Sequence, residues 1–175
     1  MRHALILLLI AGLGACNDSK PAPMPTPAPD ATDAADERLP AAVEQTRQRI
    51  VRAARSFDYA ALETLVDPKN FQYSAAESGD PVGYWSRLES ENDIPVLADI
   101  IPAVFATRGA RSDGQYVWPA ASVKNPGEWS ERDIRELLTL TTEENMKSYR
   151  EFGSYVGWRA SIRADGTWLA FIVGA

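Results

Sequence analysis

The distribution of aromatic residues limits which part of this chain can fold around a hydrophobic core. All five Trp, six Tyr and five Phe residues of the 175-residue chain lie between Phe57 and Phe171. Because aromatic side chains contribute much of the apolar area in a core, we expect one globular domain over residues 40–175. A segment of this length can bury enough surface to be stable without a disulfide or a metal.

The first part of this domain is predicted to be helical. After Pro40, apolar residues recur at helical spacing: Val43, Ile50, Ala54 and Phe57. Asp58 and Asp80 are predicted N-caps of two further helices, and Pro81 fits the first turn of the second. The first of these two runs through Leu65 and Val66 and ends at Asp67 and Pro68. The other elements expected here are a short strand at residues 71–74 and a short helix that begins at Pro95 and ends at Pro102.

The second part is predicted to contain two hairpins and two helices. Residues 104–107 and 115–118 are β-prone runs on either side of Asp113 and Gly114, which favour a hairpin turn. Ser130 with Asp133, and Thr141 with Glu144, are predicted to begin two helices, the second of which ends at Gly153.

A final hairpin over residues 155–174 is centred on Asp165 and Gly166, the residues that a type I′ turn prefers. This register places Ile162 opposite Leu169 and Ala160 opposite Phe171 on one face, with Trp168 opposite Arg163 on the other. The expected fold class is therefore α+β, with amino-terminal helices packed on a curved antiparallel sheet that ends in this long hairpin.

The chain begins like a signal peptide. Residues 1–3 are basic or polar, and residues 4–13 form an uncharged apolar run that is too short to span a bilayer. The end of this run begins a cleavage motif of four residues: Leu13, Gly14, Ala15 and Cys16. This motif resembles the lipobox of bacterial lipoproteins. The alternatives are an ordinary cleaved secretory peptide with an incidental Cys, or a Cys16 that is a small buried thiol.

The resemblance implies that diacylglycerol is attached to the Cys16 thiol, that residues 1–15 are removed, and that the new amino terminus is acylated, for example with palmitate. Several acyl chains anchor a protein stably, so the expected location is the cell envelope, facing the periplasm. In this family an Asp directly after the Cys favours the inner membrane. Asn17 stands at that position and therefore favours the outer membrane.

Residues 16–39 form a tether rich in Pro, Ala and Asp, with five alternating prolines from Pro21 to Pro29. Alternating proline favours an extended polyproline II chain. Such a segment can also be a ligand for an aromatic groove, but after a lipidated Cys we interpret it as a spacer.

The domain also resembles the cone-shaped nuclear transport factor 2-like fold, through the helix pair around Asp58 and the final Gly-Trp-Arg strand (residues 157–159) with its hairpin. The hairpin is similar to the carboxyl-terminal part of uncharacterised bacterial secreted domains that end in Asp-Gly-x-Trp. Neither resemblance implies a particular activity.

Residue usage excludes several classes of function. The only His and Cys are His3 and Cys16, so the domain has no residues for a Ser-His-Asp or Cys-His site or for a zinc site of His and Cys. No phosphate-binding glycine loop is present, and no cofactor or metal is expected. Three nearby carboxylates, Glu89, Glu91 and Asp93, lack the spacing of a calcium loop. The formal net charge of -6 argues against nucleic acid as a partner.

Two functions remain. In the first, the domain is not catalytic and binds an envelope protein or peptidoglycan, with four aromatic candidates for a binding groove: Trp118, Trp129, Tyr155 and Trp168. Core packing is the alternative role for these four residues. In the second, a small cone-fold enzyme uses a buried Asp or Glu and a Tyr in a closed pocket. A deep pocket with a buried carboxylate would favour the enzyme, and a shallow surface would favour the binding protein.

Overall fold

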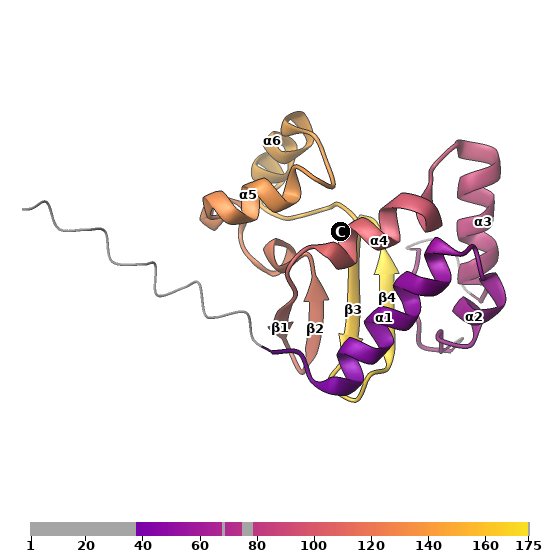
Figure 1. The fold of residues 1–175 in the computed structure, drawn as a ribbon. Helices are drawn as coiled ribbons and strands as arrows, with labels where there is room; N and C mark the ends of the chain where they lie inside the picture. Colours follow the sequence, from indigo (N-terminus) through magenta and orange to yellow (C-terminus); the bar gives the residue numbers. More distant parts are fainter. Residues whose placement is uncertain (1–37, 68, 75–78, 175) are drawn as a thin grey trace, which may run out of the picture. The chain divides into compact units, whose positions relative to one another are not determined.

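The computed structural model describes residues 38–67, 69–74 and 79–174, which belong to one compact unit, Ala35–Ala175. The lipobox residues and all but residues 38 and 39 of the predicted tether lie outside the described residues. Within this unit the chain is α+β, as predicted, and helices precede the sheet (Figure 1).

The elements follow one another in a simple order. The first helices are α1 (Ala41–Arg55), α2 (Tyr59–Glu63), α3 (Pro81–Asn92), the π-helix η1 (Val96–Ile100) and α4 (Ile101–Ala106). Next come strands β1 (Ala110–Ser112) and β2 (Gln115–Trp118), the 3-10 helices η2 (Ala120–Val123) and η3 (Pro126–Glu128), helices α5 (Glu131–Leu137) and α6 (Glu143–Phe152), and strands β3 (Arg159–Arg163) and β4 (Trp168–Ile172).

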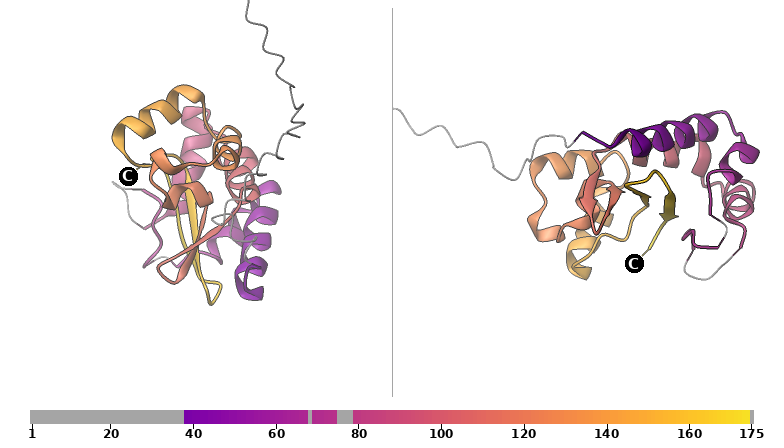
Figure 2. Two further views of the ribbon diagram at one scale, coloured as in Figure 1. Left: turned by 90° about the vertical axis from the view of Figure 1, so that its left-hand side faces the viewer. Right: turned by 90° about the horizontal axis from the view of Figure 1, so that it is seen from below.

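The four strands form one antiparallel sheet in the order β1-β2-β3-β4. Helices α1 and α4 contact each other and both contact β3, so they lie together on one face of the sheet (Figures 1 and 2). Helices α5 and α6 are inserted between β2 and β3 and pack against η2 and η3.

Local capping signals account for the amino-terminal ends of α2, α3 and α5. The Asp58 carboxylate accepts a hydrogen bond from the Ala61 amide (3.0 Å), and Asp80 accepts one from Gly83 (2.8 Å). Ser130 and Asp133 form a capping box. These side chains satisfy amide groups that have no partner within the helix, which confirms the three predicted caps.

The predicted helix ends were wrong at three places. Phe57 lies beyond α1, with 51% of its surface exposed, instead of continuing the apolar face. Helix α2 ends at Glu63, before Leu65 and Val66. Thr142, rather than Thr141, caps α6, because its side chain accepts from the Asn145 amide.

Two predicted strands were also wrong. Residues 71–74 form only an isolated bridge, between Gln72 and Ala170. Val104–Ala106 is the end of α4, and the strand before the Asp113 turn starts later, at Ala110. Pro102 does not end a helix, because it occupies the first turn of α4, where its missing N–H is not needed.

The final hairpin contains a β-bulge that the predicted register lacks. Ala160 pairs with Phe171 and Ser161 with Ala170, as predicted, but Ile162 then pairs with Trp168 and not with Leu169. The turn also differs from type I′, since Gly166 has a positive φ of 93° and Asp165 does not. An extra residue on one strand exchanges the faces of the residues beyond it, so Trp168 enters the core and Leu169 is only half-buried.

Trp168 lies at the centre of a cluster of aromatic rings. Its ring centroid lies 4.8 Å from that of Phe71, 5.6 Å from that of Trp85 and 6.5 Å from that of Phe171. Trp85 and Trp168 are 0% and 1% exposed. These contacts connect α3, the segment around Phe71 and strand β4 in one larger core, to which α1 contributes Ile50 and α4 contributes Phe105.

Because of the bulge, truncation of Trp168 and truncation of Leu169 should change the free energy of unfolding by different amounts. We expect Trp168→Ala to lower the free energy of unfolding by about 3–5 kcal/mol, because it removes a large buried ring. Leu169→Ala should cost less than about 1.5 kcal/mol, because this side chain is only half-buried. Urea unfolding of both variants measures the difference, and a larger loss at Leu169 would mean that the unbulged register is correct.

Candidate functional site

The four aromatic candidates lie in the cores and not in a groove. Trp118 and Trp168 belong to the larger core and are each 1% exposed. Trp129 (8%) and Tyr155 (2%) belong to a second core, which comprises Ala121, Trp129, Leu137, Met146, Tyr149 and Tyr155.

The polar ends of three of these rings are also satisfied within the fold. The Trp129 Nε1–H donates to the Ala121 carbonyl, the Tyr155 hydroxyl to the Trp158 carbonyl and the Trp168 Nε1–H to the Ala170 carbonyl, each at 3.0 Å. With their faces covered, these rings are not placed to stack on a ligand. Their observed role is core packing.

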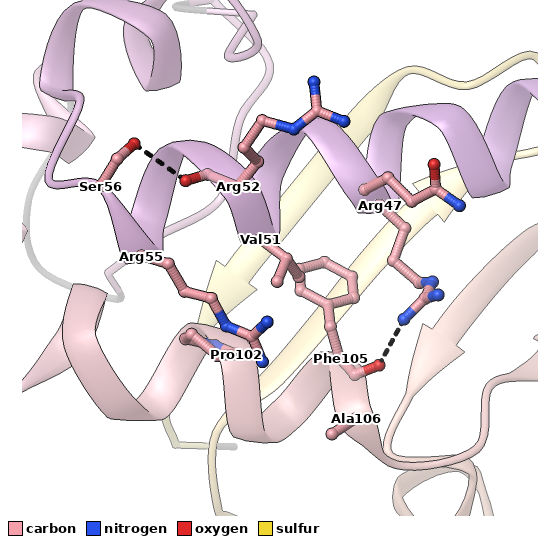
Figure 3. A pocket seen from close by; sticks show the side chains of 9 residues that line it. Arg47, Val51, Arg52, Arg55, Ser56, Pro102, Phe105 and Ala106 are labelled. Carbon is pink, nitrogen blue, oxygen red and sulfur yellow. Dashed lines mark hydrogen bonds between the residues drawn. The ribbon is translucent and has the colours of Figure 1, made fainter.

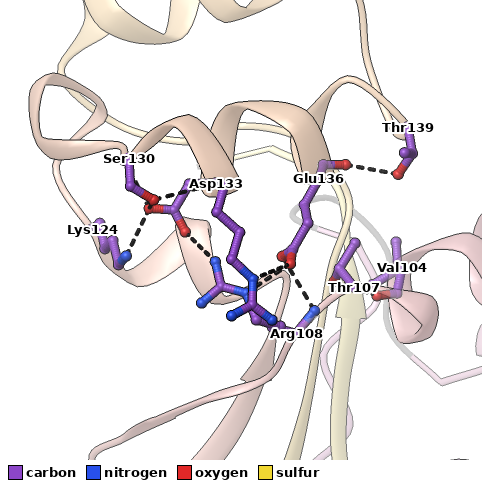
Figure 4. Close-up of polar contacts among 9 residues, drawn as sticks. Val104, Thr107, Arg108, Lys124, Ser130, Asp133, Glu136 and Thr139 are labelled. Atoms are coloured by element: carbon purple, nitrogen blue, oxygen red, sulfur yellow. Dashed lines mark hydrogen bonds and ion pairs between the residues drawn. The ribbon is translucent and has the colours of Figure 1, made fainter. Parts of the chain in front are cut away.

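The one fully buried carboxylate among the described residues belongs to an ion network on α5 (Figure 4). One Asp133 oxygen accepts from Arg108 Nη2 (2.8 Å), and the other accepts from Lys124 Nζ (2.7 Å) and from the Ser130 amide (3.0 Å) and hydroxyl (2.9 Å). Glu136 accepts from Arg108 Nε at 2.7 Å. This network ties α5 to the loop before β1 and to the residue after η2.

The network determines the charge of Asp133. Burial alone would raise the pKa of Asp133, but hydrogen bonds from Lys124 and Ser130 outweigh burial and hold this pKa below its usual value. The carboxylate is therefore ionised and fully paired. Since its oxygens are already occupied by these donors, we assign it a structural role rather than that of a general acid.

A carboxylate and a tyrosine do meet at one place outside this network. Glu89 accepts the Tyr59 hydroxyl at 3.0 Å with one oxygen and the Leu97 amide at 2.6 Å with the other. The pair thereby joins α2, α3 and η1. Across residues 38–67, 69–74 and 79–174, no three His, Cys, Asp or Glu side chains gather closely enough to hold a metal ion.

A groove with a volume of about 540 Å³ lies between α1 and α4 (Figure 3). We call it the arginine groove. Its lining residues are Arg47, Gln48, Val51, Arg52, Arg55, Ser56, Pro102, Phe105 and Ala106. Val51, Pro102 and Phe105 form an apolar floor, and the three arginines line the groove from the side of α1. None of the described residues that line this groove is an Asp, a Glu or a Tyr.

The arginines of the groove differ in whether their guanidinium groups have partners. Arg47 is held by Glu44, with Nη2 and Oε1 2.7 Å apart, and it donates from Nη1 to the Phe105 carbonyl at 2.9 Å. The hydrogen bond to Glu44 raises the pKa of Arg47. The exposed guanidinium groups of Arg52 and Arg55, by contrast, have no hydrogen-bond or ion-pair partner within the described part of the chain. In Figure 3, Arg55 extends towards Pro102 on α4, and Arg52 extends outward from α1.

Sequence patterns did not identify this groove. The arginines were visible as the polar side of an amphipathic helix, but the apolar floor comes partly from Phe105, which lies in the segment that was predicted to be a strand. The available signal was the run of α1 after Glu44, which contains four arginines and no acidic residue.

Comparisons with known proteins give no family for the chain: no family model matches it, and searches of curated proteins and of solved structures found no match. None of the helices within the described ranges has the length and apolar character needed to cross a membrane.

The buried ion network predicts a pH-dependent contribution to stability. Asp133→Asn should lower the free energy of unfolding at neutral pH by about 3–5 kcal/mol, because Arg108 and Lys124 lose their shared counter-ion. Since the pKa of Asp133 is lower in the folded state, the stabilisation is present above the unfolded pKa of about 3.9 and is lost as the pH falls through the folded value.

Chemical denaturation of both proteins at a series of pH values tests this expectation. The difference in stability between the wild type and Asp133→Asn should shrink below about pH 4. Asp99→Asn is the control, because Asp99 is exposed on η1 and its carboxylate has no hydrogen-bond or ion-pair partner within the described residues. A difference that stays constant down to low pH would contradict the assigned role of Asp133.

Proposed function

We propose that this protein is a lipid-anchored component of a bacterial cell envelope, facing the periplasm, whose domain binds an envelope partner or cell-wall material without catalysing a reaction. The observation that supports binding most directly is the arginine groove, where Arg52 and Arg55 lie beside an apolar floor without a partner for their guanidinium groups among the described residues. Surface guanidinium groups without internal partners are available to anionic groups of another molecule.

The arrangement of carboxylates favours binding over catalysis. The alternative enzyme needs a carboxylate and a tyrosine in a closed pocket, with a pKa suited to proton transfer. Asp133 is buried but fully paired, and Glu89 and Tyr59 connect helices instead of lining the arginine groove. The groove is open, which suits a surface-bound partner better than an enclosed reaction.

Support for the anchor comes from the sequence. The lipobox ends at Cys16, follows a short basic start and an apolar run, and precedes a Pro-rich segment. Acyl chains contribute about 0.8 kcal/mol for each buried methylene, so two or three chains hold a protein on a bilayer where a single chain exchanges. Asn17 favours the outer membrane within this proposal.

Intact mass of the membrane-extracted protein tests the anchor. We expect the mass of residues 16–175 plus diacylglycerol and an amide-linked acyl chain, and accumulation of the full-length precursor when the lipoprotein signal peptidase is inhibited. Cys16→Ala should remain unprocessed and unlipidated, and Asn17→Ala is the matched control that should still be processed. A mature chain without lipid, made at the same rate with the inhibitor present, would contradict the proposal.

A further inference from the structure

We propose that the carboxyl-terminal end of α1 docks the domain onto an anionic phospholipid bilayer. The docking surface consists of Arg49, Arg52, Arg55 and Phe57, and we call it the basic helix end. This inference rests on the proposed function, because the lipid anchor is what keeps the domain close to a bilayer. The basic helix end shares Arg52 and Arg55 with the arginine groove, so the inference names a partner for these two residues.

The charges on this surface are concentrated and unpaired. Arg49, Arg52 and Arg55 follow one another at intervals of three residues, and all three are exposed. Residues three apart lie on adjacent turns of one helix side. Their guanidinium groups have no partners in the described ranges of the chain. The nearest acidic side chain along the chain, Asp58, is already engaged as the cap of α2.

The two hollows beside this part of α1 share Arg52 and Ser56. One is the arginine groove, and the other, of about 190 Å³, lies between α1 and α2 and includes Arg49 and Asp58. The ridge between them therefore presents arginine on both sides. The chain as a whole has a net charge of -6, so an anionic surface would repel most of the molecule and attract this ridge, which orients the domain.

Phe57 adds an apolar residue that the fold itself does not explain. It is 51% exposed and has a positive φ of 53°, a conformation that costs a non-glycine residue energy. It stands directly after the C-cap of α1, where the Phe57 amide donates to Ala54 and the Asp58 amide to Ala53. Glycine is the usual residue in such a position.

An exposed Phe beside a row of arginines is the pattern of helices that lie in a membrane interface. Arginines contact the phosphates there, and the aromatic ring enters the boundary with the acyl chains. A carboxylate-rich polymer, such as the peptide part of a cell wall, would pair with the arginines but would not require the ring. Phe57 therefore favours a bilayer over such a polymer.

The length of chain before α1 makes this docking intramolecular. Residues 17–40 separate the proposed anchor from the helix, and a Pro-rich spacer of that length, at about 3.1 Å per residue, reaches at most about 75 Å. The bilayer is consequently present at a high effective concentration, and a few weak contacts are enough to favour docking. Each arginine near an anionic surface is expected to change the docking equilibrium about fivefold.

The test uses the acylated protein in vesicles of phosphatidylcholine, with or without about one third phosphatidylglycerol. Ala60→Cys, on the exposed side of α2 close to Phe57, carries a fluorophore, and Glu151→Cys on α6 carries the same label in a reference protein. Acrylamide, a neutral aqueous quencher, reports how exposed each label is. Docking predicts protection of residue 60 on the anionic vesicles alone, with no change at residue 151.

Charge variants identify the residues responsible. Arg52→Glu with Arg55→Glu should remove the protection, as should high salt. The matched control is Arg135→Glu with Lys147→Glu, which makes the same charge change on exposed positions of α5 and α6 and should leave protection intact. Phe57→Gly relieves the backbone strain, so it should fold at least as well and still lose protection.

Four results would overturn the inference. The label at residue 60 could be quenched equally on neutral and anionic vesicles, or both pairs of charge reversals could have the same effect. Alternatively, soluble peptidoglycan fragments could protect residue 60 on neutral vesicles, which would identify the carboxylate polymer as the partner. If the protein does not sediment with any vesicles, the anchor itself fails, and the docking that depends on it is rejected with it.

Discussion

The packing of Trp168 against Phe71 and Trp85 is the interaction on which the rest of this fold depends. It joins the last strand to α3 and to the segment around Phe71, which are far apart in the sequence. The β-bulge after Ser161 allows this packing, because it turns the Trp168 ring to the face of the sheet that the helices cover. Helix α1 lies on the same core through Ile50, and this contact is what leaves its arginines facing solvent.

Sequence patterns predicted the elements whose determinants are local. Asp58, Asp80 and Ser130 begin helices as expected, and Gly153 ends one with the positive φ that glycine allows. Predictions failed where distant contacts decide the outcome. The β-prone run that starts at Val104 becomes helical as it packs on α1, and no nearby residue indicates the bulge that exchanges Trp168 with Leu169.

The candidate site depends on the same distant contacts. Phe105 forms part of the floor of the arginine groove. A prediction that residues 104–107 form a strand therefore could not reveal the groove. Phe57 was expected in the core because it continues the spacing of α1, yet the helix ends before it and leaves its ring exposed. The four aromatic candidates can be identified from the sequence, but their burial in two separate cores follows only from the tertiary fold.

Paramagnetic relaxation of the acylated protein in nanodiscs measures whether the carboxyl-terminal end of α1 faces the bilayer. Phosphatidylglycerol nanodiscs with a spin label on the lipid headgroups broaden the NMR signals of residues near the surface. The account predicts broadening at residues 49–60 and sharp signals from α5 and α6. Equal broadening of all three helices, or broadening confined to α5 and α6, would contradict it.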